Sequence, residues 1–464
     1  MSIVSEIERI KSNISNAYNE CASKNATMPE IQNSENLPST IASITTGGGG
    51  PQYPIIEGTG KHEVRFIDYD GTILKIQYVN DGETVTPPQT PEHERLTFVE
   101  WNREYDNVTH DLDVGALYTT VSGNTELFID VTEETGLKVT LNLYKGTATG
   151  TVTIDWGDGT TTNARVTTSR SVTHTYTNYG EYMISIIGSF GYALGGASAA
   201  KPLLKGANEV TTYNLLKKCY CSSGVTVIKN YCFFNNFNLE EFTAAHLVEI
   251  WQYVFFGTKQ KTLFVPPNVA VINLYIISNC TSLKYFILPT NITSISYPAF
   301  RCSDLEKMIF PENYELTTYT YGILYNATKY FWYKKPSNDY ILSSNFASNA
   351  IFLEKIPIYD NLTAIKSYGN FSYSNIKKIA FPPSLKEMDN GVFTSCSALT
   401  DVYMYAHTPP TLGGTSIFSA GNSNLKIHVY PEDLEAYQTA TNWSSLSSKL
   451  VGDLEGEFKD GYCE

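Results

Sequence analysis

Aromatic side chains are the most promising binding groups in this chain, and they are densest between residues 314 and 340. An exposed tyrosine or tryptophan ring can stack on a sugar or fit a pocket of another protein. Side chains alternate between the two faces of a strand, so Tyr330 and Trp332 would share one face. We therefore predict that the binding residues include Tyr319, Tyr321, Tyr330 and Trp332. A contact with a neighbouring subunit or domain is the alternative use of these rings.

Residues suited to catalysis or metal binding are not grouped in the sequence. The seven histidines are isolated, and no serine-hydrolase, metalloprotease, phosphate-loop or dinucleotide motif occurs in a supporting context. The eight cysteines are scattered, which favours buried thiols over a zinc site or a disulfide framework. The 47 acidic residues are too numerous to exclude a glycosidase-like carboxylate pair by counting. We predict that the protein is not an enzyme and needs no cofactor or metal.

The size and charge of the chain limit the kinds of partner that it can bind. A chain of 464 residues is long enough for three or four domains. Its net charge of −14 argues against nucleic acid, because phosphate binding needs a basic surface. No apolar run of about 18 residues is present, so we expect no membrane span. The opening MSIVSEIERI carries two glutamates and does not read as a secretory signal peptide. These features predict a chain that stays soluble where it is made.

Residues 1–46 are predicted to be a helical segment for docking or oligomerisation. Apolar residues at spacings of four and three form a coiled-coil seam, which starts with Ile3, Ile7, Ile10 and Ile14. Isoleucine at both seam positions favours three or four strands, so we expect a homo-oligomer, with a trimer favoured. An amphipathic helix that packs on its own chain or on a partner is the alternative. Residues 47–61, rich in glycine and proline, are predicted to be a linker.

Residues 62–122 are predicted to form a small β module. Val64–Tyr69 and Ile73–Val79 are strand-like, and Asp70-Gly71 between them is a hairpin turn signal. Leu96–Trp101 and Leu112–Tyr118 are further predicted strands. The order F-x-D-Y-D-G-T-x-L-x-x-Q-Y-V-x-x-G, followed by L-T-F-V-E-W, resembles the internalin-type B repeat. That resemblance implies a surface spacer or a weak binding module.

Residues 123–195 are predicted to form an immunoglobulin-like β-sandwich. Four segments alternate apolar and polar residues at strand period: Leu137–Tyr144, Gly150–Trp156, Ser171–Tyr176 and Glu181–Ile187. Asp155-Trp156-Gly157-Asp158-Gly159-Thr160, followed by His174-Thr175-Tyr176, resembles the polycystic-kidney-disease (PKD) type domain. We expect the aspartates to accept backbone hydrogen bonds within a tight turn. A calcium site there is the less favoured alternative.

Residues 196–464 are predicted to be a leucine-rich repeat solenoid with a C-terminal cap. The pattern around Cys280, Leu283 and Phe286 recurs 22 residues later around Cys302, Leu305 and Met308. Aromatic residues close successive repeats: Phe300, Phe371, Phe393 and Phe418. This version of the repeat resembles the BspA type, which implies a protein of bacterial surfaces or of phages. Residues 311–351 depart from the pattern, so one or two repeats there are predicted to be degenerate.

The segment from Ile10 to Ile44 resembles an N-terminal region of tail-associated proteins from phages of Gram-positive bacteria, through I-x-x-N-I-x-x-A-Y and a following A-T-M-P-E. Together these features predict a mainly β, multidomain virion protein of a bacteriophage: a tail fibre, baseplate or head appendage. We expect it to assemble in the host cytoplasm, to dock on other virion proteins and to bind a bacterial surface protein or glycan through its repeats. A surface adhesin of a Gram-positive bacterium, or a structural decoration protein of the particle, is the alternative. The absence of an export signal favours the phage.

Overall fold

The computed structural model describes residues 54–146, 148–188, 190–196, 202–207, 214–296, 300–301, 305–312, 314, 328–342, 350–366 and 370–463. They are mainly β, as predicted. The chain divides into two compact units. The first comprises the chain up to Pro91 together with Glu104–Ala116, and the second comprises Glu92–Arg103 together with the chain from Leu117. The predicted helical anchor, with Ile3, Ile7, Ile10 and Ile14, lies outside the described residues, so its helix and oligomeric role stay predictions. No helix in the described part of the chain is long and apolar enough to cross a membrane.

The first unit is built on four strands of a five-stranded sheet with the order β1-β3-β2-β5-β4, in which β4 is Leu96–Trp101. Their bounds are β1 Ile55–Gly58, β2 His62–Ile67, β3 Ile73–Val79 and β5 Leu112–Thr120, the last of which continues into the second unit. β2 and β3 are the predicted hairpin, and Gly71 takes a φ of +94°, which glycine adopts without strain. β1 pairs in parallel with β3 although it falls within the predicted linker.

A buried ion pair joins two neighbouring strands of this sheet, β2 and β5. Arg65 of β2 and Asp113 of β5 are register partners, so their side chains leave the sheet side by side. The guanidinium donates two hydrogen bonds of 2.7 Å, from Nε to Oδ1 and from a terminal nitrogen to Oδ2. Both side chains are less than a tenth exposed. This bidentate geometry compensates two charges that would otherwise be costly to bury.

The second unit begins with a β-sandwich. Its strands are β6 Thr125–Val131, β7 Lys138–Lys145, β8 Gly150–Asp155, β9 Thr161–Val166, β10 Ser169–Thr175, β11 Gly180–Ile187 and β12 Tyr192–Leu194. Trp156 and Tyr176 are fully buried, and the tyrosine hydroxyl donates to the Trp156 carbonyl over 2.9 Å. In the turn after β8, Asp155 accepts from the Gly157 amide and Asp158 from the Thr160 amide, each over 3.0 Å. The predicted use of these carboxylates is confirmed.

Both sheets of the sandwich continue into the repeats. β6 pairs with β14 (Leu216–Tyr220), and β12 pairs with β15 (Val225–Ile228). One hydrophobic core runs from Leu127 to Leu450. The predicted domain limit between residues 195 and 196 stays a prediction, but the sheets and the core run through it. The sandwich therefore covers the first end of the solenoid.

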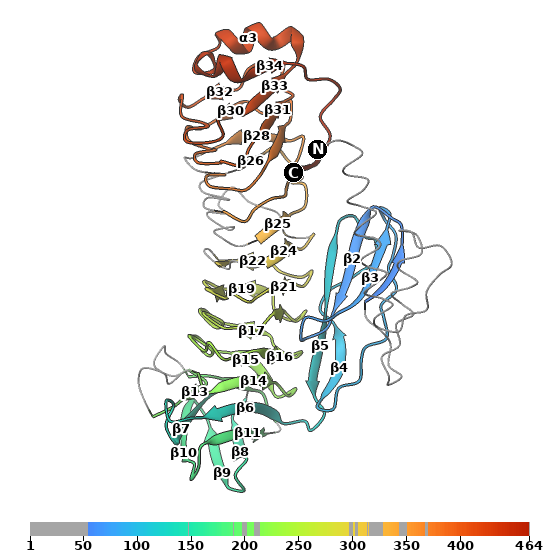
Figure 1. Ribbon diagram of the computed structural model, residues 1–464. Coiled ribbons are helices and arrows are strands. Elements are labelled where there is room, and N and C mark those ends of the chain that lie inside the picture. Colours follow the sequence, from blue (N-terminus) through green and yellow to red (C-terminus); the bar gives the residue numbers. More distant parts are fainter. Residues whose placement is uncertain are drawn as a thin grey trace, which may run out of the picture. The chain divides into compact units, whose positions relative to one another are not determined.

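The solenoid consists of two rows of short parallel strands stacked turn on turn (Figure 1). The first row holds β14, β16 Glu241–Thr243, β18 Thr262–Phe264, β21 Tyr285–Ile287, β24 Leu305–Ile309, β25 Thr328–Trp332, β27 Ile356–Ile358, β29 Lys378–Phe381, β31 Asp401–Met404 and β33 Lys426–Val429. The second holds β15, β17 Glu249–Ile250, β19 Val271–Ile272, β22 Ser294–Ile295, β26 Tyr340–Leu342, β28 Leu362–Ile365, β30 Glu387–Met388 and β32 Thr411–Leu412. Two short strands, β20 Ile277–Ser278 and β23 Phe300–Arg301, pair at a third position, and β13 Leu204–Lys205 pairs with β7.

The repeat residues fill the interior between the rows. Leu283, Leu305 and Phe310 are fully buried, as the 22-residue pattern predicts. The closing aromatics stack on one another: the Phe371 and Phe393 ring centroids lie 5.3 Å apart with an interplanar angle of 8°. Equal spacing in the sequence thus becomes vertical stacking, because each turn of the solenoid places the same repeat position directly above the last.

Short helices and a last strand follow the repeats in the region where the C-terminal cap is predicted. They are η1 Pro431–Asp433, α3 Leu434–Thr439, η2 Trp443–Lys449 and β34 Leu450–Gly452. Tyr437 and Trp443 are buried and donate to the carbonyls of Ala406 and Pro410 over 2.6 and 2.7 Å. Beyond the cap the chain returns along the solenoid, and β35 (Gly461–Cys463) pairs antiparallel with β27.

Candidate binding surface

The predicted binding residues on β25 are buried. Phe331 and Tyr333 face the solenoid core, while Tyr330 and Trp332 lie on the opposite face, so the predicted alternation is confirmed. However, Tyr330 and Trp332 are only 9% and 8% exposed and form a small buried cluster with Ile309. The expectation that they are exposed is therefore wrong. Tyr319 and Tyr321 lie outside the described residues, and the binding role of the four aromatics stays a prediction.

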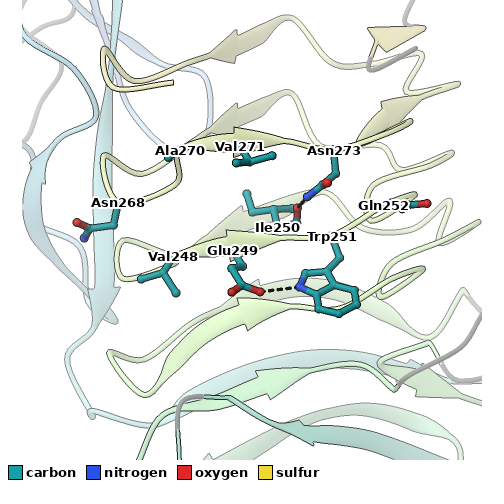
Figure 2. Close-up of a pocket in the computed structure, with 9 residues that line it drawn as sticks. All are labelled: Val248, Glu249, Ile250, Trp251, Gln252, Asn268, Ala270, Val271 and Asn273. Atoms are coloured by element: carbon teal, nitrogen blue, oxygen red, sulfur yellow. Dashed lines mark hydrogen bonds between the residues drawn. The ribbon is translucent and has the colours of Figure 1, made fainter. Parts of the chain in front are cut away.

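An open hollow lies instead on the outside of the second row, over β17 and β19. Its volume is about 450 Å³, which is in the range of small-ligand sites. Of the ten large hydrophobic side chains exposed in the described part of the chain, three line it: Val248, Trp251 and Val271. Figure 2 shows Glu249 beside Trp251 on one turn and Val271 on the next. Apolar groups clustered on one exposed surface indicate a contact site.

Trp251 is fixed in place although it is exposed. Its indole Nε1 donates a 2.8 Å hydrogen bond to Oε2 of Glu249. The Lys229 ammonium lies 3.6 Å from the centre of the indole ring, a cation–π contact from the turn below. Burial lowers the pKa of Lys229 more than the nearby Glu249 carboxylate raises it. Both contacts hold the ring in one orientation, yet 37% of the residue is exposed.

Amide side chains supply the polar part of the hollow. Gln252 and Asn268 are exposed, and Asn273 is partly buried. The Asn273 side-chain amide donates a 2.7 Å hydrogen bond to the Ile250 carbonyl, which ties the two turns of the hollow together. The backbone under the hollow is part of the solenoid ladder, so the site is carried by a rigid scaffold.

A stack of tyrosines lies two residues further along each turn than Lys229, Trp251 and Asn273. Tyr231, Tyr253 and Tyr275 are spaced by 22 residues and occupy the same position in successive turns. Their ring centroids are 5.0 and 4.8 Å apart, with interplanar angles of 6° and 23°. All three are partly exposed and have left-handed backbone, with φ of +60°, +57° and +50°. The tight turn after each second-row strand therefore presents one tyrosine at the surface.

Titratable residues form another ladder, on the first row near the cap. His428 lies between two carboxylates: Nδ1 is 2.7 Å from Asp453 and Nε2 is 3.0 Å from Asp401. The imidazole also stacks on Tyr403, with ring centroids 4.6 Å apart. Partial burial raises the pKa of Asp401, but hydrogen bonds from His428 and Thr400 outweigh it and leave the pKa below the ordinary value. These contacts join three successive turns of the solenoid.

The cysteines agree with the prediction of buried thiols. Cys219, Cys221, Cys232, Cys280 and Cys396 are buried thiols that form no disulfide. Desolvation raises the pKa of Cys219 and Cys232 well above the ordinary value, which leaves both thiols protonated and weakly nucleophilic. Among the described residues, no three His, Cys, Asp or Glu side chains are grouped so that they could hold a metal ion.

Two stacked rows of short parallel strands around a leucine-rich interior define a leucine-rich repeat β-solenoid. Residues 211–329 and 325–446 match the BspA type leucine rich repeat region, in six copies. The matched residues make up half of the chain, and the protein belongs to this family. The internalin-like, PKD-like and phage-tail resemblances lie outside the match and stay predictions.

Solved structures with this repeat are similar over part of their length. A leucine-rich repeat protein from Bacteroides ovatus is 20% identical with a TM-score of 0.31, over 46% of this chain and 54% of that one. A leucine rich cell surface protein from Faecalibacterium prausnitzii is 17% identical with a TM-score of 0.27, over 45% and 60%. The pneumococcal vaccine antigen PcpA is 14% identical with a TM-score of 0.23, over 49% and 75%. The chain thus spans little more than half of the first two proteins. No curated protein matches it.

Proposed function

We propose that this chain is a non-enzymatic surface protein of the adhesin type, which binds a partner through the outside of its solenoid. The observation that carries the proposal is the exposed hollow at Trp251, on a rigid leucine-rich repeat scaffold. Exposed apolar groups that cluster inside a polar rim are typical of sites that bind a partner or a ligand. Repeat proteins commonly bind through such continuous surfaces.

The chemistry of the hollow suits contact rather than catalysis. The carboxylate of Glu249 is engaged by the indole of Trp251. The other polar groups are the amides of Gln252, Asn268 and Asn273, which do not ionise at neutral pH and so are poor general acids or bases. Indole, valine and amide groups provide area, shape and hydrogen bonds.

The bacterial adhesin has broader support than the phage protein predicted first. The family match extends over residues 211–446, whereas the phage-tail resemblance is confined to Ile10–Ile44, outside the described residues. Display on a virion stays a prediction and is the second outcome of the following test.

Antibodies raised against the purified chain test display directly. We expect them to label intact cells of the encoding organism, because an adhesin must be accessible from outside. Label on released virions and not on intact cells would support the phage setting. Label that appears only after the cells are lysed, with none on virions, would contradict surface display in both settings. An antibody against a cytoplasmic protein of the same cells is the control for leakage.

A further inference from the structure

The hollow at Trp251 is specific enough in its chemistry to indicate a class of ligand. We propose that it binds a neutral saccharide, which stacks on Trp251 and hydrogen-bonds to the surrounding amides. This inference rests on the proposed function, since it assigns a ligand to the same surface. Trp251 and the amides are its recognition groups, and Lys229 and Glu249 are positioning residues.

The indole supplies a flat apolar platform. A pyranose ring has faces lined by C–H groups with slight positive charge, and these meet the negative face of an aromatic ring favourably. The indole of Trp251 is accessible to a ligand, since the residue is 37% exposed. It is nevertheless immobilised by the bond to Glu249 and by the Lys229 ammonium. A platform that is already ordered loses little entropy when a ligand binds.

The rim supplies hydrogen-bond groups that match hydroxyls. Exposed Gln252 and Asn268 side chains carry both donors and acceptors, as hydroxyl groups do. Val248 and Val271 flank the platform and add apolar contact. The volume of about 450 Å³ leaves room for a short oligosaccharide that extends out of the open side.

The charge of the hollow argues for a neutral ligand. Glu249 is the one charged residue among the nine that line it. The nearby Lys229 is 9% exposed and lies against the indole and the Tyr144 ring, where it cannot reach an anion in the hollow without leaving both. An anionic sugar would therefore meet a carboxylate and no available cation.

The repeat accounts for the position of Trp251 in the solenoid. Lys229, Trp251 and Asn273 are 22 residues apart and occupy the same position in three successive turns. Lysine below and asparagine above leave the indole as the one aromatic group of the three, so the stacking platform is confined to one turn of the two that form the hollow.

Fluorine NMR of the full chain labelled with 5-fluorotryptophan tests the proposal. The protein has five tryptophans, and Trp251→Phe identifies the resonance of Trp251 by its loss. We titrate maltotriose, cellotriose and chitotriose as neutral probes, 3′-sialyllactose as an anionic probe and N-acetyl-Leu-Leu-amide as a peptide probe. We expect at least one neutral trisaccharide to shift the Trp251 resonance saturably, with a dissociation constant on the order of 1 mM. The other four resonances should stay in place.

Calorimetry with the trisaccharide that binds extends the test to variants. We expect Trp251→Ala to weaken binding at least tenfold and Tyr179→Ala, a change at a half-exposed tyrosine away from the hollow, to leave it unchanged. The saccharide assignment is overturned if no neutral probe shifts the Trp251 resonance, if sialyllactose or the peptide shifts it instead, or if Trp251→Ala binds normally. None of these results contradicts the proposed function, because surface labelling and cell adhesion test that function separately.

Discussion

Tyr231 and Tyr253 stack face to face, with ring centroids 5.0 Å apart and an interplanar angle of 6°, although 22 residues separate them in the chain. The contact exists because every turn of the solenoid repeats the same backbone path. Both residues have positive φ, a backbone conformation that costs a residue with a Cβ atom about 1–2 kcal/mol and costs glycine little. Stacking between aromatic rings stabilises by about 0.5–1.5 kcal/mol beyond burial and thus offsets that strain.

Substitutions of Tyr253 should reveal this balance. Tyr253→Phe keeps both stacks and should change the free energy of unfolding by less than about 0.5 kcal/mol. Tyr253→Ala loses both stacks and keeps the strained φ, so we expect a loss of about 2 kcal/mol. Tyr253→Gly loses the stacks but relieves the strain, and should therefore be less destabilised than the alanine variant. Urea unfolding followed by circular dichroism ranks the three. An alanine variant more stable than the glycine variant would contradict the account.

The ion pair between Arg65 and Asp113 should be essential to the first unit. Asp113→Leu removes the bidentate carboxylate from the buried guanidinium, which keeps Glu63 at 3.8 Å, and we expect a loss of about 3–5 kcal/mol in the free energy of unfolding. The double variant Arg65→Met with Asp113→Leu removes both charges and should recover most of that loss. Hydrogen exchange of the β2 and β5 amides measures the local stability. Equal exchange in the single and the double variant would show that the charge left on Arg65 by the loss of Asp113 is not the cause of the lower stability.

Stability in acid should depend on the contact between His428 and Asp401. The pKa of Asp401 is lower in the folded protein than its ordinary value of 3.8. Its stabilising contribution is therefore complete above about pH 4 and is lost as the pH falls through the lowered pKa. His428→Phe keeps the ring stack on Tyr403 but loses the hydrogen bond to Asp401.

We expect the melting temperature of the His428→Phe variant to fall less between pH 4 and pH 2 than that of the unmodified protein. His246→Phe, which replaces a partly exposed histidine elsewhere in the same repeats, is the matched control. Thermal unfolding at four or five pH values gives the change of melting temperature with pH for each protein. Parallel curves for the unmodified protein and the His428 variant would refute the role of this contact.

The returning C-terminal strand should protect the middle of the solenoid. Asp460 accepts hydrogen bonds from the Lys335 ammonium and the Asp360 backbone amide, over 2.7 and 2.6 Å, just before β35 pairs with β27. Asp460→Ala removes both bonds, so we expect the amides of Ile356–Ile358 to exchange roughly tenfold faster. Asp460→Asn keeps an acceptor for the Asp360 amide, so its exchange rate should lie between those of the unmodified protein and the alanine variant. Unchanged exchange in the alanine variant would mean that β35 holds its place without Asp460.

Much of the fold could be predicted because repeats and turns leave local signals. The 22-residue pattern predicted the solenoid, and Asp70-Gly71 predicted the β2–β3 hairpin at the right residues. β1 gave no such signal, since Ile55–Gly58 is a short stretch beside prolines whose pairing with β3 is decided by tertiary contact. The continuity of the sandwich with the solenoid was equally hidden, because β6–β14 pairing joins strands about 90 residues apart.

The site was harder to predict because density of aromatic residues is a poor guide to exposure. Tyr330 and Trp332 lie in the most aromatic segment and are buried. Trp251 stands in a less conspicuous stretch, and its signal was its place in the repeat: it follows a second-row strand, level with Lys229 and Asn273. Aligning the repeats and inspecting the outward positions would have found it.

Adhesion of protein-coated beads to living cells tests the central claim most directly. Beads carrying the full chain are applied to a panel of intact bacterial and epithelial cells, beside beads carrying Trp251→Ala, Tyr179→Ala or albumin. We predict that the unmodified protein and the Tyr179 variant attach equally to at least one cell type, and that Trp251→Ala reduces attachment at least tenfold. Attachment of the unmodified protein at the level of albumin on every cell type would contradict the proposed adhesin. Full attachment by the Trp251 variant would move the binding surface away from the hollow.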